Sequence, residues 1–265
     1  MTALRLQKLE IENCEEALLN GYYDWGTAYG VAPADSASRS EIAHRGYDLY
    51  DGCPAQSGFE IGPAEIFLSV GINSRLALPD ACRILALRER ARPLLARISD
   101  DARLEDADDD QLDAAAKLMT LLEEAEHIGR GKVTKVLHKK RPAFIPIVDS
   151  VVADFLWKNF PWRLHGASPA RDVLLVFRDI LLARQDILET VQANMGARGF
   201  SVTTVRVLEA LIWLGWHERN GGGGFGTPIT TLWAARSLAD ARRVAERLWR
   251  AQGCLTSRRR EHIQG

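Results

Sequence analysis

The sequence predicts an all-α fold, and three observations support this prediction. Apolar residues recur at helical spacing along most of the 265-residue chain. Glycine and proline residues stand where these segments end or begin. No segment alternates apolar and polar residues over more than four positions, apart from the short extended piece Phe144–Val148. With 46% hydrophobic residues, the chain has enough apolar side chains for a substantial core.

Four helices are predicted in the first half of the chain. Pro63 and Pro79 open the second and the third, because proline fits the first turn of a helix. Pro93 lies inside the third helix and should kink or divide it. Asp110 is expected to cap the fourth. These helices span residues 3–19, 62–70, 79–98 and 111–126.

The segment 99–110 is a candidate boundary. Seven of its twelve residues are acidic, which predicts an exposed loop that repels phosphate. A divalent-cation site is the alternative, but the run lacks the glycine and the ordered ligand spacing of a calcium loop. We therefore expect an aromatic-rich helical lobe at residues 1–110 and a second helical lobe at 111–265, either separate or continuous as one domain.

The centre of the sequence, residues 121–160, predicts a helix-hairpin-helix and then a third helix. Gly129 should end the first helix in the left-handed conformation. The second helix should run from about residue 131 to 138, before Pro142 stops it. Asp149 fits the N-cap of the third helix, because an apolar helical sequence follows it directly.

Three more helices are predicted towards the C-terminus, at about residues 170–193, 202–216 and 237–251. The second of them is apolar on almost every side, so it should lie at the centre of the fold. The glycine-rich stretch 221–226 lacks the lysine of a phosphate-binding loop and is interpreted as a connector or lid. The arginines of the last helix are interpreted as a solvated face.

Composition excludes several classes of protein. The formal net charge is −1, so any nucleic-acid surface requires segregated charge. No stretch is apolar enough for a membrane span or a signal peptide, which predicts a soluble, cytoplasmic protein. The cysteines stand singly, which predicts reduced thiols and no metal site. No cofactor motif is present, and none is expected. The cysteines are Cys14, Cys53, Cys82 and Cys254.

The main functional signal is a basic stretch from Gly129 to Arg141 that contains no acid. A hairpin offers backbone N–H groups to a phosphate, and nearby cations release counterions from DNA. The sequence therefore predicts duplex DNA as a partner, although a plain solvated turn is the alternative. The expected DNA-binding residues are His127, Gly129, Arg130, Gly131, Lys132, Lys135, Lys139 and Lys140.

The same segment resembles the endonuclease III type of helix-hairpin-helix DNA glycosylase, in which a hairpin L-P-G-V-G-R-K precedes V-D-T-H at the head of a helix. With Gly129 on the second hairpin glycine, Val148-Asp149-Ser150 falls on V-D-T without a gap. This resemblance, over about residues 111–160, implies a DNA-repair hydrolase with Asp149 as the catalytic carboxylate. The chain also resembles an uncharacterised bacterial family with a similar basic hairpin.

The departures from the glycosylase pattern narrow the expected activity. His127 replaces the first hairpin glycine, and Val151 replaces the histidine of V-D-T-H. Gly131 occupies the position of the Schiff-base lysine, so a monofunctional glycosylase is expected and a lyase is not. Two alternatives remain: a non-catalytic DNA-binding or regulatory protein with a degenerate hairpin, and an enzyme unrelated to nucleic acid.

All five tyrosines lie between Gly21 and Glu60, among glycine, proline and serine. Aromatic faces of this kind bind bases, so the region is a candidate wall of a pocket for a flipped base. The alternative is a long surface segment that its tyrosines pin to the body. The base-pocket candidates are Tyr22, Tyr23, Trp25 and Tyr47.

Overall fold

We analysed a computed structural model of the chain, which describes residues 11–19 and 50–219, apart from 55, 73, 162 and 165. Residues 11–19 are helical, and the described part contains no strand, which confirms the all-α prediction. The helices from residue 63 onwards are α3 (Pro63–Val70), α4 (Leu78–Ala86), α5 (Arg88–Leu95), α6 (Asp109–Glu123), α7 (Arg130–Lys140), α8 (Ser150–Asn159), α9 (Pro169–Ala183), α10 (Gln185–Ala197) and α11 (Thr204–Arg219).

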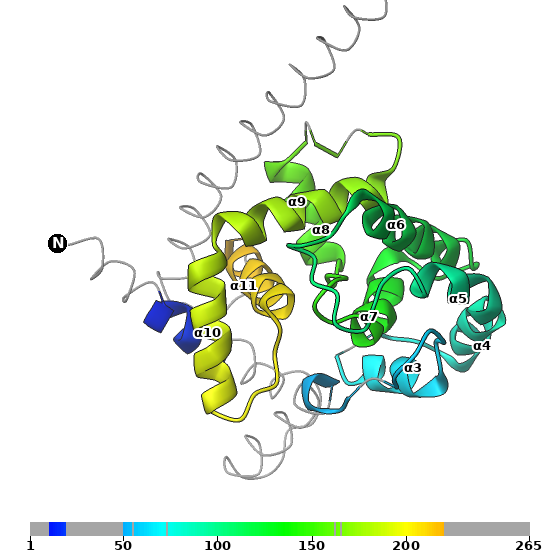
Figure 1. Cartoon of the computed structure of the whole chain (residues 1–265), viewed down its shortest axis with the longest axis horizontal. Helices are drawn as coiled ribbons and strands as arrows, with labels where there is room; N and C mark the ends of the chain where they lie inside the picture. Colours follow the sequence, from blue (N-terminus) through cyan, green and yellow to red (C-terminus); the bar gives the residue numbers. More distant parts are fainter. Residues whose placement is uncertain are drawn as a thin grey trace, which may run out of the picture.

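Helix α7 lies inside the described body, with α3 and α6 packed against it (Figure 1). Helix α6 also packs against α5 and α9, and α11 packs against α8 and α10. Buried side chains from Cys14 to Leu214 form one continuous hydrophobic core. Positions from Val133 to Arg141 in and after α7 are nearly all buried, so the basic helix predicted as a surface element lies at the centre.

A turn of six residues connects α6 to α7, and its capping differs from the prediction. Asp108, and not Asp110, is the N-cap of α6, and its carboxylate accepts a hydrogen bond from the backbone N–H of Gln111. His127, and not Gly129, adopts the left-handed conformation, with φ of 66°. Gly129 has extended dihedrals and serves as the N-cap of α7. Helix α6 ends at Glu123, before this turn, so the chain needs six residues to reverse between the helices.

The predicted cap of α8 is confirmed. The Asp149 carboxylate accepts hydrogen bonds from the backbone N–H groups of Val151 and Val152, both at 3.0 Å. These are two of the four N–H groups that a helix start leaves without an intrahelical partner. The preceding piece, residues 144–148, forms no strand and begins as a turn.

Two predicted helices are each divided in two. The helix predicted at 79–98 breaks at Leu87, between α4 and α5, while Pro93 lies inside α5. The helix predicted at 170–193 breaks at Arg184, whose φ of −130° is not helical. The second break redirects the chain, because α9 packs against α6 whereas α10 packs against α11. At both breaks, the helices on the two sides pack mainly against different partners. The local sequence does not specify these partners.

Several predictions fall outside the described residues. They concern the start of the first helix, most of the tyrosine-rich region, the glycine-rich connector, the final helix with its arginines, and Cys254. The cysteines that are described, Cys14, Cys53 and Cys82, form no disulfide with one another. Within the described part, no helix is both long and apolar enough to span a membrane.

Candidate functional site

Asp149 and the start of α7 lie against each other. A Cβ atom added to Gly131 would lie 3.3 Å from the Cα of Asp149 and 3.6 Å from its Cβ. Asp149 itself is half-buried at the head of α8. The two residues that the sequence alignment placed at the lysine and aspartate positions are therefore neighbours in space.

Three of the predicted DNA-binding residues keep some exposure at this end of α7. His127 is exposed in the turn. Arg130 forms a bidentate ion pair with Glu123, at 2.7 and 3.1 Å, and a quarter of its side chain stays exposed. The ammonium nitrogen of Lys132 donates a hydrogen bond to a carboxylate oxygen of Asp80, at 2.6 Å. This hydrogen bond is the main cause of the lowered pKa of Asp80.

The three remaining lysines of the predicted DNA-binding set have their ammonium groups directed into the protein. Lys135 donates to the carbonyl oxygen of Ile72 at 2.9 Å, and Lys139 donates to that of Tyr50. Lys140 donates to the carbonyl oxygen of Gln56 at 2.5 Å and is ion-paired with Glu65. Lys139 and Lys140 are buried, so their side chains offer little surface to the backbone of a DNA duplex.

Arg141 completes this internal set of cations. Its guanidinium donates to the carbonyl oxygens of Ile98, at 2.7 Å, and of Leu95, at 3.4 Å. Leu95 is the last residue of α5, so Arg141 satisfies carbonyl groups at a helix C-terminus, where positive charge is favourable. The basic run thus ties α7 to the 50–58 segment and to α5.

A second group of buried charges joins α11 to the residues that precede α3. Arg206 forms ion pairs with Glu209 at 2.5 Å and with Asp51 at 3.0 Å. Burial raises the pKa of Glu209 to about 7, the Arg206 charge opposes this rise, and the negative charges of Asp149 and Asp51 add to it. Glu209 therefore holds a proton more readily than an exposed glutamate, and the charge of Asp149 contributes to this.

Tyr50 connects these buried charges to α7. Its hydroxyl donates to the carbonyl oxygen of Lys135 at 2.6 Å, and its ring stacks on His138 with centroids 6.0 Å apart. Lys139 and Arg206 both make cation–π contacts with the same ring, at 5.0 and 5.4 Å from its centroid. Burial is the main cause of the strongly raised pKa of Tyr50, so the phenol stays protonated.

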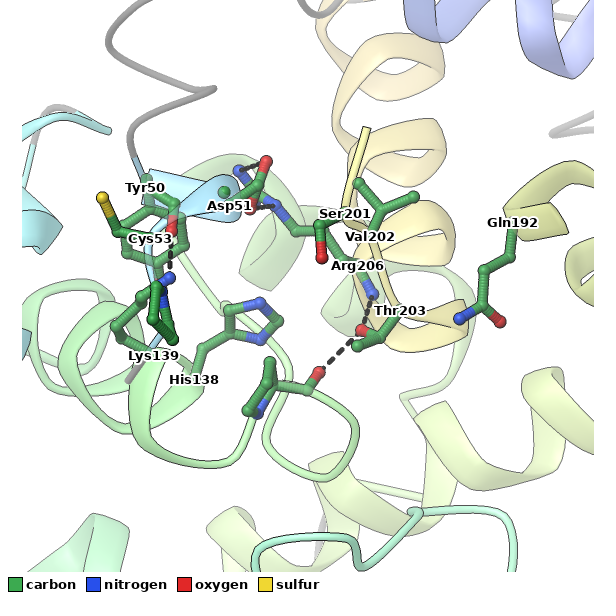
Figure 2. A pocket seen from close by; sticks show the side chains of 13 residues that line it. Tyr50, Asp51, Cys53, His138, Lys139, Gln192, Ser201, Val202, Thr203 and Arg206 are labelled. Carbon is green, nitrogen blue, oxygen red and sulfur yellow. Dashed lines mark hydrogen bonds and ion pairs between the residues drawn. The ribbon is translucent and has the colours of Figure 1, made fainter. Parts of the chain in front are cut away.

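A polar pocket of about 380 Å³ opens beside this group (Figure 2). Its walls come from the residues before α3, the C-terminal end of α7, α10 and the start of α11. The lining residues are Tyr50, Asp51, Gly52, Cys53, Pro54, His138, Lys139, Pro142, Gln192, Ser201, Val202, Thr203 and Arg206. Among the described residues, no three His, Cys, Asp or Glu side chains are arranged to hold a metal ion.

The sequence contained a signal for part of this site. Arg206 and Glu209 are the two charges inside the otherwise apolar start of α11, and charges at such positions are buried only when paired. Neither was predicted as a site residue, and nor were Asp51 and His138. The base-pocket candidates Tyr22, Tyr23, Trp25 and Tyr47 lie outside the described residues. Asp51 and Tyr50 reach the pocket from the end of the same aromatic-rich region.

These features define an all-α protein in which a buried charge network adjoins a polar pocket. The chain belongs to a family of unknown function, DUF6308, whose model matches residues 37–215. This membership confirms the predicted likeness to an uncharacterised family. No curated protein and no solved structure matches the chain, so the likeness to DNA glycosylases stays a prediction.

Proposed function

We propose that the protein is a DNA-acting hydrolase that cleaves the N-glycosidic bond of a damaged or modified base, with Asp149 as the catalytic carboxylate. The observation that carries this proposal is the packing of Asp149 against the start of α7, where a Cβ on Gly131 would lie 3.3 Å from the Asp149 Cα. The Asp149 charge also helps to raise the pKa of the buried Glu209. Hydrolysis of a glycosidic bond needs a carboxylate close to the sugar.

Asp149 and Glu209 suit different roles. Asp149 lies at a helix N-terminus, where the helix dipole favours negative charge, and is only half-buried. A carboxylate at this position would stabilise the positive charge that develops on the sugar as the base leaves. Glu209 is buried, so it acts on Asp149 through its charge and not by touching the substrate.

The burial of the lysines narrows the surface proposed for DNA. We assign DNA contact to the hairpin, residues 124–129, and to the first turn of α7, which includes Arg130 and Lys132. Backbone N–H groups at the start of a helix suit a phosphate, although that of Lys132 already donates to the carbonyl oxygen of Gly129. Lys135, Lys139 and Lys140 are left out, because their ammonium groups bind carbonyl oxygens and a carboxylate inside the protein.

The activity is tested by incubating the wild type and Asp149→Asn with duplexes that carry alkylated, deaminated, oxidised or mismatched bases. Abasic sites are scored by alkali cleavage. We expect base release by the wild type and its loss in Asp149→Asn, which keeps a capping side chain of similar size. Borohydride should trap no covalent complex, because Gly131 provides no amine.

Asp154→Asn is the matched control, since it makes the same chemical change on an exposed residue of the same helix. It should release bases as the wild type does. Equal release by Asp149→Asn and the wild type would remove Asp149 from the mechanism. Binding without base release on any substrate would support the non-catalytic alternative, and absence of binding would favour an enzyme unrelated to nucleic acid.

DNA contact is tested separately by measuring affinity as a function of salt. Arg130→Met should lower both the affinity and the slope of affinity against salt concentration, because it removes one cation beside the hairpin. Arg97→Met is the control, since Arg97 also pairs with an acid but lies in the turn after α5. Equal losses in the two variants would argue against the hairpin as the contact surface.

A further inference from the structure

His138 presents a hydrogen-bond acceptor to the polar pocket. Its Nδ1 lies 2.7 Å from the carbonyl oxygen of Ile145. A carbonyl oxygen only accepts, so Nδ1 must carry the hydrogen. Burial is the main cause that lowers the pKa of His138 to about 3, and the charges of Arg206 and Lys139 lower it further. The ring is therefore neutral, and none of the described residues donates a hydrogen bond to the lone pair of Nε2.

Two of the side chains that line the same pocket are cations, and one of them, Arg206, is paired with Asp51 and Glu209. Lys139 and Arg206 line it together with a single carboxylate, that of Asp51. The two cations depress the pKa of His138 because the potential at the ring is positive. Figure 2 shows the imidazole between Lys139 and Arg206, with its outer edge directed into the space among the lining side chains.

Lys139 can donate to a ligand as well as to the protein. An ammonium group has three N–H donors, and one of them meets the carbonyl oxygen of Tyr50. Burial is the main cause of the lowered pKa of Lys139, so the charged form lacks full solvation. A bound anion would restore part of that solvation.

We propose that the pocket binds a small oxyanion that keeps a proton, such as a hydrogenphosphate group, with His138 Nε2 accepting its O–H and Lys139 donating to its oxygens. The volume of about 380 Å³ lies at the lower end of the range for small-molecule sites, so an organic group attached to the oxyanion also fits. This site goes beyond the proposed hydrolase and does not depend on Asp149.

Inorganic phosphate and sulfate distinguish this site from one that recognises charge alone. At pH 7.5 both are tetrahedral and mostly doubly charged, but hydrogenphosphate has an O–H donor and sulfate has none. Titration calorimetry at constant ionic strength should show phosphate binding at least about ten-fold more tightly, which corresponds to about 1.4 kcal/mol. Sulfate would leave the lone pair of His138 without a donor. Equal affinities, or no binding of phosphate, would overturn the proposal.

His138→Asn tests the acceptor directly. The amide N–H of asparagine lies near the position of Nδ1 and still reaches the Ile145 carbonyl, while Nε2 is removed. The preference for phosphate over sulfate should disappear. Ser201→Ala, which removes an exposed hydroxyl at the rim, should keep it. An unchanged preference in His138→Asn would assign the selectivity to another group.

A measurement on the wild-type protein tests the same contact if His138→Asn does not fold. In protein labelled with ¹⁵N-histidine, His138 should show the Nδ1–H tautomer. Phosphate should shift its Nε2 resonance, and sulfate at the same concentration should not. A protonated His138 ring, or an Nε2 resonance that phosphate leaves unchanged, would contradict the proposed contact.

Discussion

The ammonium group of Lys140 lies 3.4 Å from a carboxylate oxygen of Glu65, and both side chains are completely enclosed. Glu65 also accepts hydrogen bonds from the backbone N–H groups of Gln56 and Gly62. Lys140 in turn donates to the carbonyl oxygen of Gln56. One residue of the basic helix thus holds both α3 and the segment in front of it.

Lys140→Met should therefore destabilise the fold by about 3 kcal/mol or more, because it leaves the Glu65 charge buried without its cation. Urea unfolding measures this loss. Lys158→Met is the control, since the Lys158–Asp154 pair on α8 is exposed and should contribute within about 0.5 kcal/mol. Equal effects of the two changes would show that Lys140 is not enclosed as described.

His138 should make the free energy of unfolding depend on pH in the acid range. Its folded pKa of about 3 lies below the ordinary 6.5, so between these values the unfolded chain binds a proton that the folded protein does not. Stability should fall as pH drops from 6.5 to 3, by up to about 1.4 kcal/mol per pH unit. Glu209 acts in the opposite direction: its folded pKa of about 7 exceeds the ordinary 4.5, so stability falls as pH rises between them.

The two effects offset each other between pH 4.5 and 6.5, and below pH 4.5 Glu209 no longer opposes the effect of His138. Urea unfolding at a series of pH values should show a loss on the acid side that is smaller in His138→Asn than in the wild type. Equal acid sensitivity in the two proteins would mean that His138 is not buried in its neutral form.

The N-cap of α8 predicts different costs for two substitutions of Asp149. Asp149→Ala removes the acceptor for two backbone N–H groups and should cost about 1 kcal/mol. Asp149→Asn keeps an acceptor oxygen and should cost less. Urea unfolding of both variants checks this order, and a reversed order would indicate that the charge matters more than the cap.

The coupling between Asp149 and Glu209 can be measured without any substrate. Because the Asp149 charge helps to raise the pKa of Glu209, Asp149→Asn should lower that pKa from about 7 towards its ordinary value. Carboxyl ¹³C resonances followed through a pH titration report it. Asp154→Asn should leave the Glu209 titration unchanged, and a similar shift in both variants would rule out a specific coupling.

Gly131 and Gly196 provide a matched pair for the contact between α7 and Asp149. A Cβ at Gly196 meets nothing within 4 Å, so Gly196→Ala in α10 should stabilise by about 0.5–1 kcal/mol through helix propensity. Gly131→Ala should stabilise the protein less than this, or destabilise it, because the added Cβ would lie 3.3 Å from the Cα of Asp149. Equal increases in the free energy of unfolding, measured with urea, would show that α7 and Asp149 separate easily.

The sequence by itself determined the fold class, most helix starts and the N-cap role of Asp149. These features are local: helical spacing, proline in a first turn, and a short polar side chain before an apolar helix each act over a few residues. The pairing of Arg206 with Glu209 was also within reach of the sequence, since their separation of three residues places them on one face of α11.

Only the tertiary structure decided the orientation of the basic side chains and the breaks at Leu87 and Arg184. A run of lysines has the same pattern whether it faces solvent or binds carbonyl groups inside the fold. The partners of Lys139 and Lys140 lie 75 to 89 residues away in the sequence, and Ile98, which accepts from Arg141, lies 43 residues away. Burial of these cations depends on the convergence of the 50–65 segment and α5 on α7, which no local pattern encodes.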